Sequence, residues 1–191
     1  QSENNAFSLG SFKTMQEYEE KIPESDLDLY LEGIQENQTV LLVLEGGEPI
    51  TGATLRILEL IKHANLTVMF IQPSTSLKSD TAALNSRLAF GALQEYARSG
   101  LLNRMFFVQK SRIESLVGDV PINMYEKRIA EILSYKIAML YFFENSDSVI
   151  STTCDRPVGC RLATIGISTL DTATSETRLL FPLEDTRTIE F

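Results

Sequence analysis

A glycine-rich loop at residues 45–53 carries the strongest chemical signal in the sequence. Gly46 and Gly47 directly follow an apolar run, and Gly52 and Ala53 stand where a helical pattern begins. Backbone N–H groups at the start of a helix are unpaired and the helix dipole is positive there, so such a loop can hold an anion. The same glycines can also form a turn that only reverses the chain. Neither a Walker lysine nor a dinucleotide glycine fingerprint is present to decide between these interpretations.

Cysteine, histidine and paired aspartates offer few other candidates. Cys154 and Cys160 could close a small disulfide loop, but two further zinc ligands are missing beside them, and we expect ordinary thiols. His63 falls near the end of a helical pattern, where a cation suits the helix dipole, and we expect it at the surface. Asp26 and Asp28 could bind a cation, but the first turn of a helix also attracts carboxylates because of its dipole.

Strand-like and helical patterns alternate along the chain, which predicts an α/β fold with a mainly parallel sheet and flanking helices. The runs at residues 39–44 and 66–71 are continuously apolar, as in strands that are buried on both faces, and residues 104–108 form a third strand. Helical patterns at residues 53–64 and 80–102 connect these strands. Such crossover helices are typical of a parallel sheet.

The pattern changes toward the C-terminus. Apolar residues recur over roughly five turns after Pro121, which predicts a long central helix. The segments 161–167 and 178–182 are strand-like, so we expect the start of a β-rich second layer there. The sequence thus predicts an α/β domain at residues 1–145 and a partial β-rich segment at residues 146–191.

Three loops are expected at one rim of the predicted sheet. They cover residues 45–52, 72–79 and 109–121, and each follows a predicted strand. Parallel strands place their carboxyl ends at the same edge, where ligands of such sheets bind. We therefore expect the glycine-rich loop to share its site with the other two loops.

Composition excludes several classes of partner. The 26 acidic and 17 basic side chains give a formal net charge of −9, which repels a phosphate backbone, so we expect no nucleic acid partner. No apolar run approaches the roughly 20 residues needed to cross a bilayer, and we expect no membrane association. Residues 1–10 lack the features of a secretory signal, which favours a cytoplasmic location.

Two longer stretches match the element order of a known family. The stretch VLEGGEPITGATLRILELIKHANLTVMFIQP, residues 43–73, reads as a strand, a glycine-rich loop, a helix and a strand. Residues 86–122 continue with a helix, a strand and a loop, and a long helix follows. Over residues 39–145 this order resembles the tubulin/FtsZ GTPases. The resemblance implies that residues 1–145 form a nucleotide-binding-type domain whose N-terminal part is missing from this sequence.

The resemblance also implies a cofactor, GTP with Mg²⁺, and a set of site residues. Phosphate would lie on the glycine loop, ribose beside residues 72–75, and the base beside residues 109–111. An acidic residue after the central helix would position water in the adjoining subunit. On this resemblance the nucleotide-contacting residues are Gly46, Gly47, Thr51, Gly52, Ala53, Ser74, Gln109 and Ser111, the catalytic residue is Asp147, and no side chain is assigned as a metal ligand.

Departures from the family pattern set the expected function. Glu48 and Pro49 stand in the phosphate loop, adding a negative charge and removing an N–H donor. Where the family reads guanine with an Asn-Asp pair just after a strand, this sequence has Gln109, Lys110 and Ser111, so a carboxylate for the base is missing. We therefore expect a divergent tubulin/FtsZ-like protein that self-associates or docks into a larger assembly, with weak or lost GTP binding, as a degenerate GTPase. The alternatives are an active GTP-dependent polymerising GTPase and a doubly wound domain for a small anionic metabolite.

Overall fold

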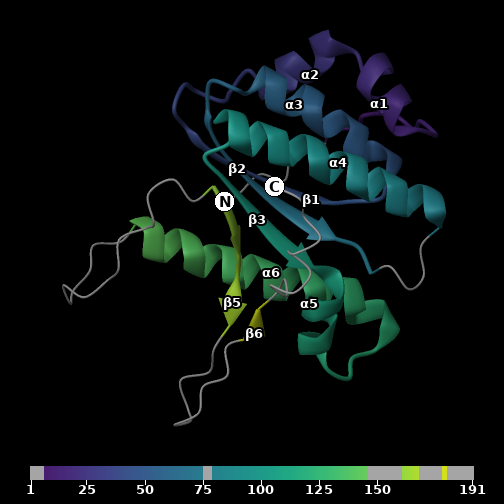
Figure 1. The fold of residues 1–191 in the computed structure, drawn as a ribbon, viewed down its shortest axis with the longest axis vertical. Coiled ribbons are helices and arrows are strands. Elements are labelled where there is room, and N and C mark those ends of the chain that lie inside the picture. Colours follow the sequence, from purple (N-terminus) through teal and green to yellow (C-terminus); the bar gives the residue numbers. More distant parts are fainter. Residues whose placement is uncertain (1–6, 75–78, 146–160, 168–177, 180–191) are drawn as a thin grey trace.

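The fold is built on a four-stranded parallel sheet (Figure 1). A computed structural model describes residues 7–74, 79–145, 161–167 and 178–179. The strands follow one another in space in the order of the sequence. They are β1 (Thr39–Glu45), β2 (Asn65–Gln72), β3 (Arg104–Gln109) and β4 (Leu162–Thr164). This confirms the predicted α/β class and the parallel direction of the sheet.

Helices α3 (Ala53–Leu60) and α4 (Asp80–Ser99) connect the first three strands and cover one face of the sheet, called here the α4 face (Figure 1). Their apolar residues pack on those side chains of β2 and β3 that point to this face. Val68, Phe70, Leu93 and Met105 are almost completely buried there. Two short helices, α1 (Met15–Lys21) and α2 (Glu24–Leu31), pack outside α3.

The opposite face, called here the α6 face, is covered by α5 (Lys110–Val117) and α6 (Ile122–Asn145) (Figure 1). The alternate side chains of β2 and β3, including Met69 and Val108, point to this face and form a second core cluster. Ile113 of α5 and Leu133 of α6 complete the contact. The long helix predicted after Pro121 is thereby confirmed as α6, which spans 24 residues.

Local signals in the sequence explain where the helices start and stop. Thr14 caps α1, because its hydroxyl oxygen accepts a hydrogen bond from the Glu17 amide. Ser79 caps α4 in the same way through the Ala82 amide. Gly100 ends α4 in the left-handed conformation, at φ 89°, which glycine adopts without strain.

Two details differ from the sequence-based prediction. Helix α5 occupies most of the segment 109–121, which was predicted as a loop. Strand β1 was predicted to be buried on both faces, and this is wrong for the α6 face, where Leu41 and Val43 keep 38% and 44% of their surface exposed. The physical reason is that β1 lies at the end of the sheet and α6 does not extend over it far enough to exclude water.

The C-terminal strands divide between two sheets. Strand β4 pairs with β3 and belongs to the parallel sheet, although it lies beyond the predicted boundary at residue 145. Strands β5 (Gly166–Ile167) and β6 (Arg178–Leu179) form a separate antiparallel pair. Among the described helices, none combines the length and the apolar character that a membrane span requires.

Candidate functional site

The carboxyl ends of β1, β2 and β3 meet at one rim of the sheet. The register pairs Glu45 with Ile71 and Gln72 with Gln109, so the three strands end nearly level. A hydrogen bond from Gln109 Nε2 to Gln72 Oε1 (3.3 Å) links two of these ends. The prediction that the three following loops start at the same edge is confirmed.

A partly buried ion pair crosses this rim. Lys110 follows β3 directly, and its Nζ lies 3.0 Å from Glu45 Oε2 at the end of β1 and 3.5 Å from Glu126 Oε1 of α6. Only 17% of the lysine side chain is exposed. Partial burial alone would lower the pKa of Lys110, but the hydrogen bond and charge of Glu45, with Glu126, outweigh it and raise the pKa. Lys110 is therefore held as a cation between two carboxylates.

A second polar group lies on the same rim. Ser74, after β2, donates from its hydroxyl to Glu114 Oε2 of α5 at 3.0 Å. Partial removal from water and the neighbouring Glu114 carboxylate raise the pKa of the Tyr125 hydroxyl on α6. The rim thus contains a lysine, several carboxylates and neutral donors, which come from β1, α5, α6 and the segment after β2.

The two glycines that follow β1 are tied into the fold. The Gly46 amide donates to the Ile71 carbonyl at 3.0 Å, and a Cβ at Gly46 would lie 2.6 Å from Phe70 Cζ. Gly47 adopts φ 100°, in the left-handed region, and its carbonyl accepts a hydrogen bond from Asn85 Nδ2 at 3.3 Å. The packing and the turn therefore require glycine at these positions without any ligand.

The start of α3 is covered by α1. A short 3₁₀ helix, η1 (Pro49–Gly52), leads into α3, and the Thr51 hydroxyl donates to the Glu48 carbonyl inside it. Thr51, Gly52 and Ala53 are buried. A Cβ at Gly52 would lie 2.1 Å from the Met15 carbonyl oxygen of α1. The residues predicted to contact phosphate thus lie in one loop, whose end at residues 51–53 is covered by α1.

The remaining predicted residues lie apart from this loop or outside the description. Ser111 is exposed in the first turn of α5. His63 is exposed after α3, with Nε2 2.9 Å from the Ile34 carbonyl oxygen, which fits the expected surface position. Asp147 and the two cysteines, Cys154 and Cys160, lie outside the described residues.

The sequence interpretation missed the ion pair, although it considered the loops that contain both partners. Glu45 and Lys110 are 65 positions apart, and each is the residue that ends or follows a predicted strand. One signal in the sequence could have predicted this ion pair. An acidic residue ends the first predicted strand, a basic residue follows the third, and only the second strand lies between them. Glu114 and Tyr125 carried no such signal, because the helix that holds Glu114 was not predicted.

The described arrangement can orient polar groups and hold charge, but it offers a small anion only one nearby lysine, which is already paired. Within the described part of the chain, no group of three or more His, Cys, Asp or Glu side chains is placed to hold a metal ion. Comparison of the sequence with protein-family models, with curated proteins and with solved structures gives no match.

Proposed function

We propose that this chain is a divergent tubulin/FtsZ-like protein that works by self-association or by docking into a larger assembly, with weak or lost GTP binding. The observation that carries the proposal is the ion pair of Lys110 with Glu45. It lies at the rim where a parallel sheet binds its ligand, and it satisfies the charge of the lysine internally. A cytoplasmic location is part of this proposal.

Two further features support weak nucleotide binding. The Gly46 and Thr51 amides already donate to protein carbonyls, so they are not available to phosphate oxygens. Glu45 and Glu114 place carboxylates at the rim, where they would repel a triphosphate. These residues do not fit GTP in the described arrangement, and no catalytic step is assigned to them.

Nucleotide titration tests this proposal. We expect calorimetry with GTP and with ATP, with and without Mg²⁺, to show no saturable binding at nucleotide concentrations below about 1 mM. The binding free energy would then be no more favourable than about −4 kcal/mol. Self-association measured by sedimentation should not change when nucleotide is added. Micromolar GTP binding that the substitution Gly47→Asp abolishes would overturn the loss of nucleotide binding.

One observation favours the alternative, a GTP-dependent polymerising GTPase. Lys110 is a cation at the rim, and a phosphate could replace Glu45 as its partner. The variant Glu45→Gln removes that competition. The alternative is supported if the wild-type protein binds GTP and this variant binds it several-fold more tightly. Glu45 would then compete with a phosphate for Lys110 in a functional nucleotide site.

A further inference from the structure

Strand β1 is the last strand at one end of the sheet. Within the described residues β1 pairs only with β2. The Gln38 carbonyl accepts from the Asn65 amide and the Gly46 amide donates to the Ile71 carbonyl, so the even-numbered residues direct their backbone groups to β2. Because these directions alternate along a strand, Thr39, Leu41 and Val43 direct theirs outward.

This edge lacks the features that normally prevent pairing with another chain. Natural edge strands are short, or carry lysine, proline or a bulge. Strand β1 has seven residues, TVLLVLE, with no lysine or proline, and its only charge is at its last residue. Leu41 and Val43 are also exposed on the α6 face. A second β-strand would therefore find both backbone partners and apolar side chains here.

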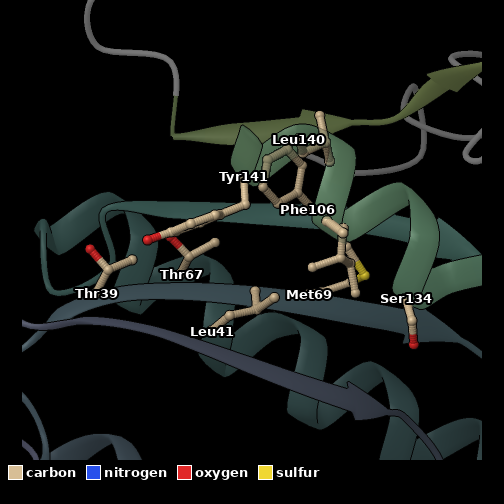
Figure 2. A pocket seen from close by; sticks show the side chains of 10 residues that line it. Thr39, Leu41, Thr67, Met69, Phe106, Ser134, Leu140 and Tyr141 are labelled. Atoms are coloured by element: carbon tan, nitrogen blue, oxygen red, sulfur yellow. The ribbon is translucent and has the colours of Figure 1, made fainter. Parts of the chain in front are cut away.

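A groove borders the same edge. It has a volume of about 370 Å³ and lies between the α6 face of the sheet and the C-terminal half of α6 (Figure 2). Thr39 and Leu41 of β1 form one wall, and Ser134, Ala138 and Tyr141 of α6 form the other. Figure 2 shows Thr39 and Leu41 on the strand side of this groove and Ser134 and Tyr141 on the helix side. The exposed side of β1 and the groove are thus one continuous surface.

This surface has few charged residues, unlike the chain as a whole. The chain carries a formal net charge of −9, so two copies repel each other over most of their surfaces. Residues 39–44 of β1 have no charge, and residues 132–142 of α6 have no acidic side chain and a single basic one, Lys136. Two copies can therefore approach here without bringing carboxylates together, except at Glu45.

We propose that this edge and groove form a self-association surface, on which a second copy of the chain pairs its β1 antiparallel to the first. The proposal rests on the self-association included in the proposed function. A two-fold axis at Leu42 brings the largest part of the two strands together. It places Leu41 opposite Val43 of the second copy, and the backbone groups of both residues point outward and can pair. Thr39 lies opposite Glu45 of the second copy, so no like charges face each other. Such a self-complementary patch is what a two-fold dimer requires.

Sedimentation velocity over a range of concentrations tests the surface. The wild-type chain should dimerise, and Val43→Lys should weaken dimerisation at least tenfold, because it places a charge beside Leu41 of the second copy. Leu88→Lys is the matched control, since Leu88 is an exposed leucine on α4 and should leave dimerisation unchanged. A wild-type monomer at hundreds of micromolar, or equal dimerisation of wild type and Val43→Lys, overturns the proposal.

Cysteine cross-linking tests the register, and both variants replace residues that pack against the same core cluster. In a background of Cys154→Ser and Cys160→Ser, the substitution Leu42→Cys places two thiols at the axis, where Cα atoms of a non-hydrogen-bonded pair are about 4.5 Å apart. We expect a disulfide-linked dimer under mild oxidation. Val40→Cys is the control, because Val40 lies opposite Leu44 of the second copy and should not cross-link to itself. Equal cross-linking of both variants, or of neither, overturns this arrangement.

Failure of this surface and failure of the proposed function give different results. Micromolar GTP binding together with cross-linking at position 42 would leave the surface standing and remove the proposed loss of nucleotide binding. A monomer that binds no nucleotide would remove the surface and leave docking to other subunits. A different occupant, an apolar ligand or a strand from another protein, would be indicated by a third result. In that case the wild-type chain stays monomeric but binds the ligand or the other protein, and Val43→Lys abolishes this binding.

Discussion

Gly46 shows how a glycine that suggests phosphate binding can have a packing role. A Cβ there would lie 2.6 Å from Phe70 Cζ and 2.7 Å from Ser86 Oγ. Gly46→Ala should therefore lower the free energy of unfolding by about 1–3 kcal/mol, the usual cost of overpacking a core. Urea unfolding measures this change with or without nucleotide present.

Gly91 provides the matched control for that experiment. It lies inside α4, and a Cβ there would meet nothing within 4 Å. Gly91→Ala should raise the free energy of unfolding by about 0.5–1 kcal/mol, because alanine loses less backbone freedom on folding. If Gly46→Ala were as stable as the wild type, the packing explanation of this glycine would be wrong.

The ion pair at the rim predicts a pH-dependent contribution to stability. The pKa of Lys110 in the folded protein is raised above its ordinary value of 10.5. The stabilisation from its charged form is therefore complete below pH 10.5, and it is lost as the pH rises through the higher folded pKa. Glu45→Gln should lower the free energy of unfolding by about 1–2 kcal/mol at pH 8, and by less in strongly alkaline solution.

Glu126 is the second carboxylate near Lys110, and its substitution shows how much of the stabilisation comes from Glu45. Its side chain is 76% exposed, and its oxygen is farther from Lys110 Nζ than that of Glu45. Glu126→Gln should therefore change stability by well under 1 kcal/mol at any pH. Equal effects of the two substitutions in urea unfolding would mean that the charge of the rim as a whole, rather than the Glu45 contact, stabilises the lysine.

At the scale of the elements, α1 depends on a close backbone contact with η1. A Cβ at Gly52 would lie 2.1 Å from the Met15 carbonyl oxygen, and a backbone oxygen cannot rotate away as a side chain can. Gly52→Ala should displace α1 from α3. Hydrogen exchange should show amides of residues 15–21 exchanging at least tenfold faster, while those of β2 stay protected.

Gly33 is the control for the displacement of α1, because a Cβ there would meet nothing within 4 Å. Gly33→Ala should leave the exchange of α1 unchanged. Unaltered protection of residues 15–21 in Gly52→Ala would show that the contact between α1 and η1 can relax. The start of α3 would then be more accessible to a ligand than the described packing suggests.

The elements that sequence reasoning found are those with long apolar patterns. The runs that became β1, β2 and β3 were clear because parallel strands are apolar throughout, and their shared direction followed from the crossover helices. Helix α5 was missed because it is short and buries only Ile113 and Val117. The contact of Lys110 with Glu45 was not predictable in the same way, because it depends on a side chain reaching across the end of β2.

At the scale of the whole molecule, the exposure of β1 depends on which helices cover each face of the sheet. The apolar run at residues 39–44 indicates a strand covered on both faces, but the sequence pattern does not say whether a helix of the same chain supplies the cover. On the α4 face α3 does so, whereas on the α6 face the groove remains open. The difference between pattern and structure at Leu41 and Val43 thus locates the surface on which self-association is proposed.

The net charge of the molecule predicts how salt acts on this self-association. Two copies with a formal charge of −9 each repel at long range, whereas the strands of the proposed interface carry a charge only at Glu45 and form no ion pair with each other. Raising the ionic strength from about 0.01 M to about 0.1 M shortens the screening length from about 30 Å to about 10 Å. Dimerisation measured by sedimentation equilibrium should therefore strengthen several-fold with salt, while Val43→Lys should dimerise at least tenfold more weakly than the wild type in both conditions. A dimer that weakens with salt would mean that ion pairs hold the copies together, and so that a surface other than β1 is used.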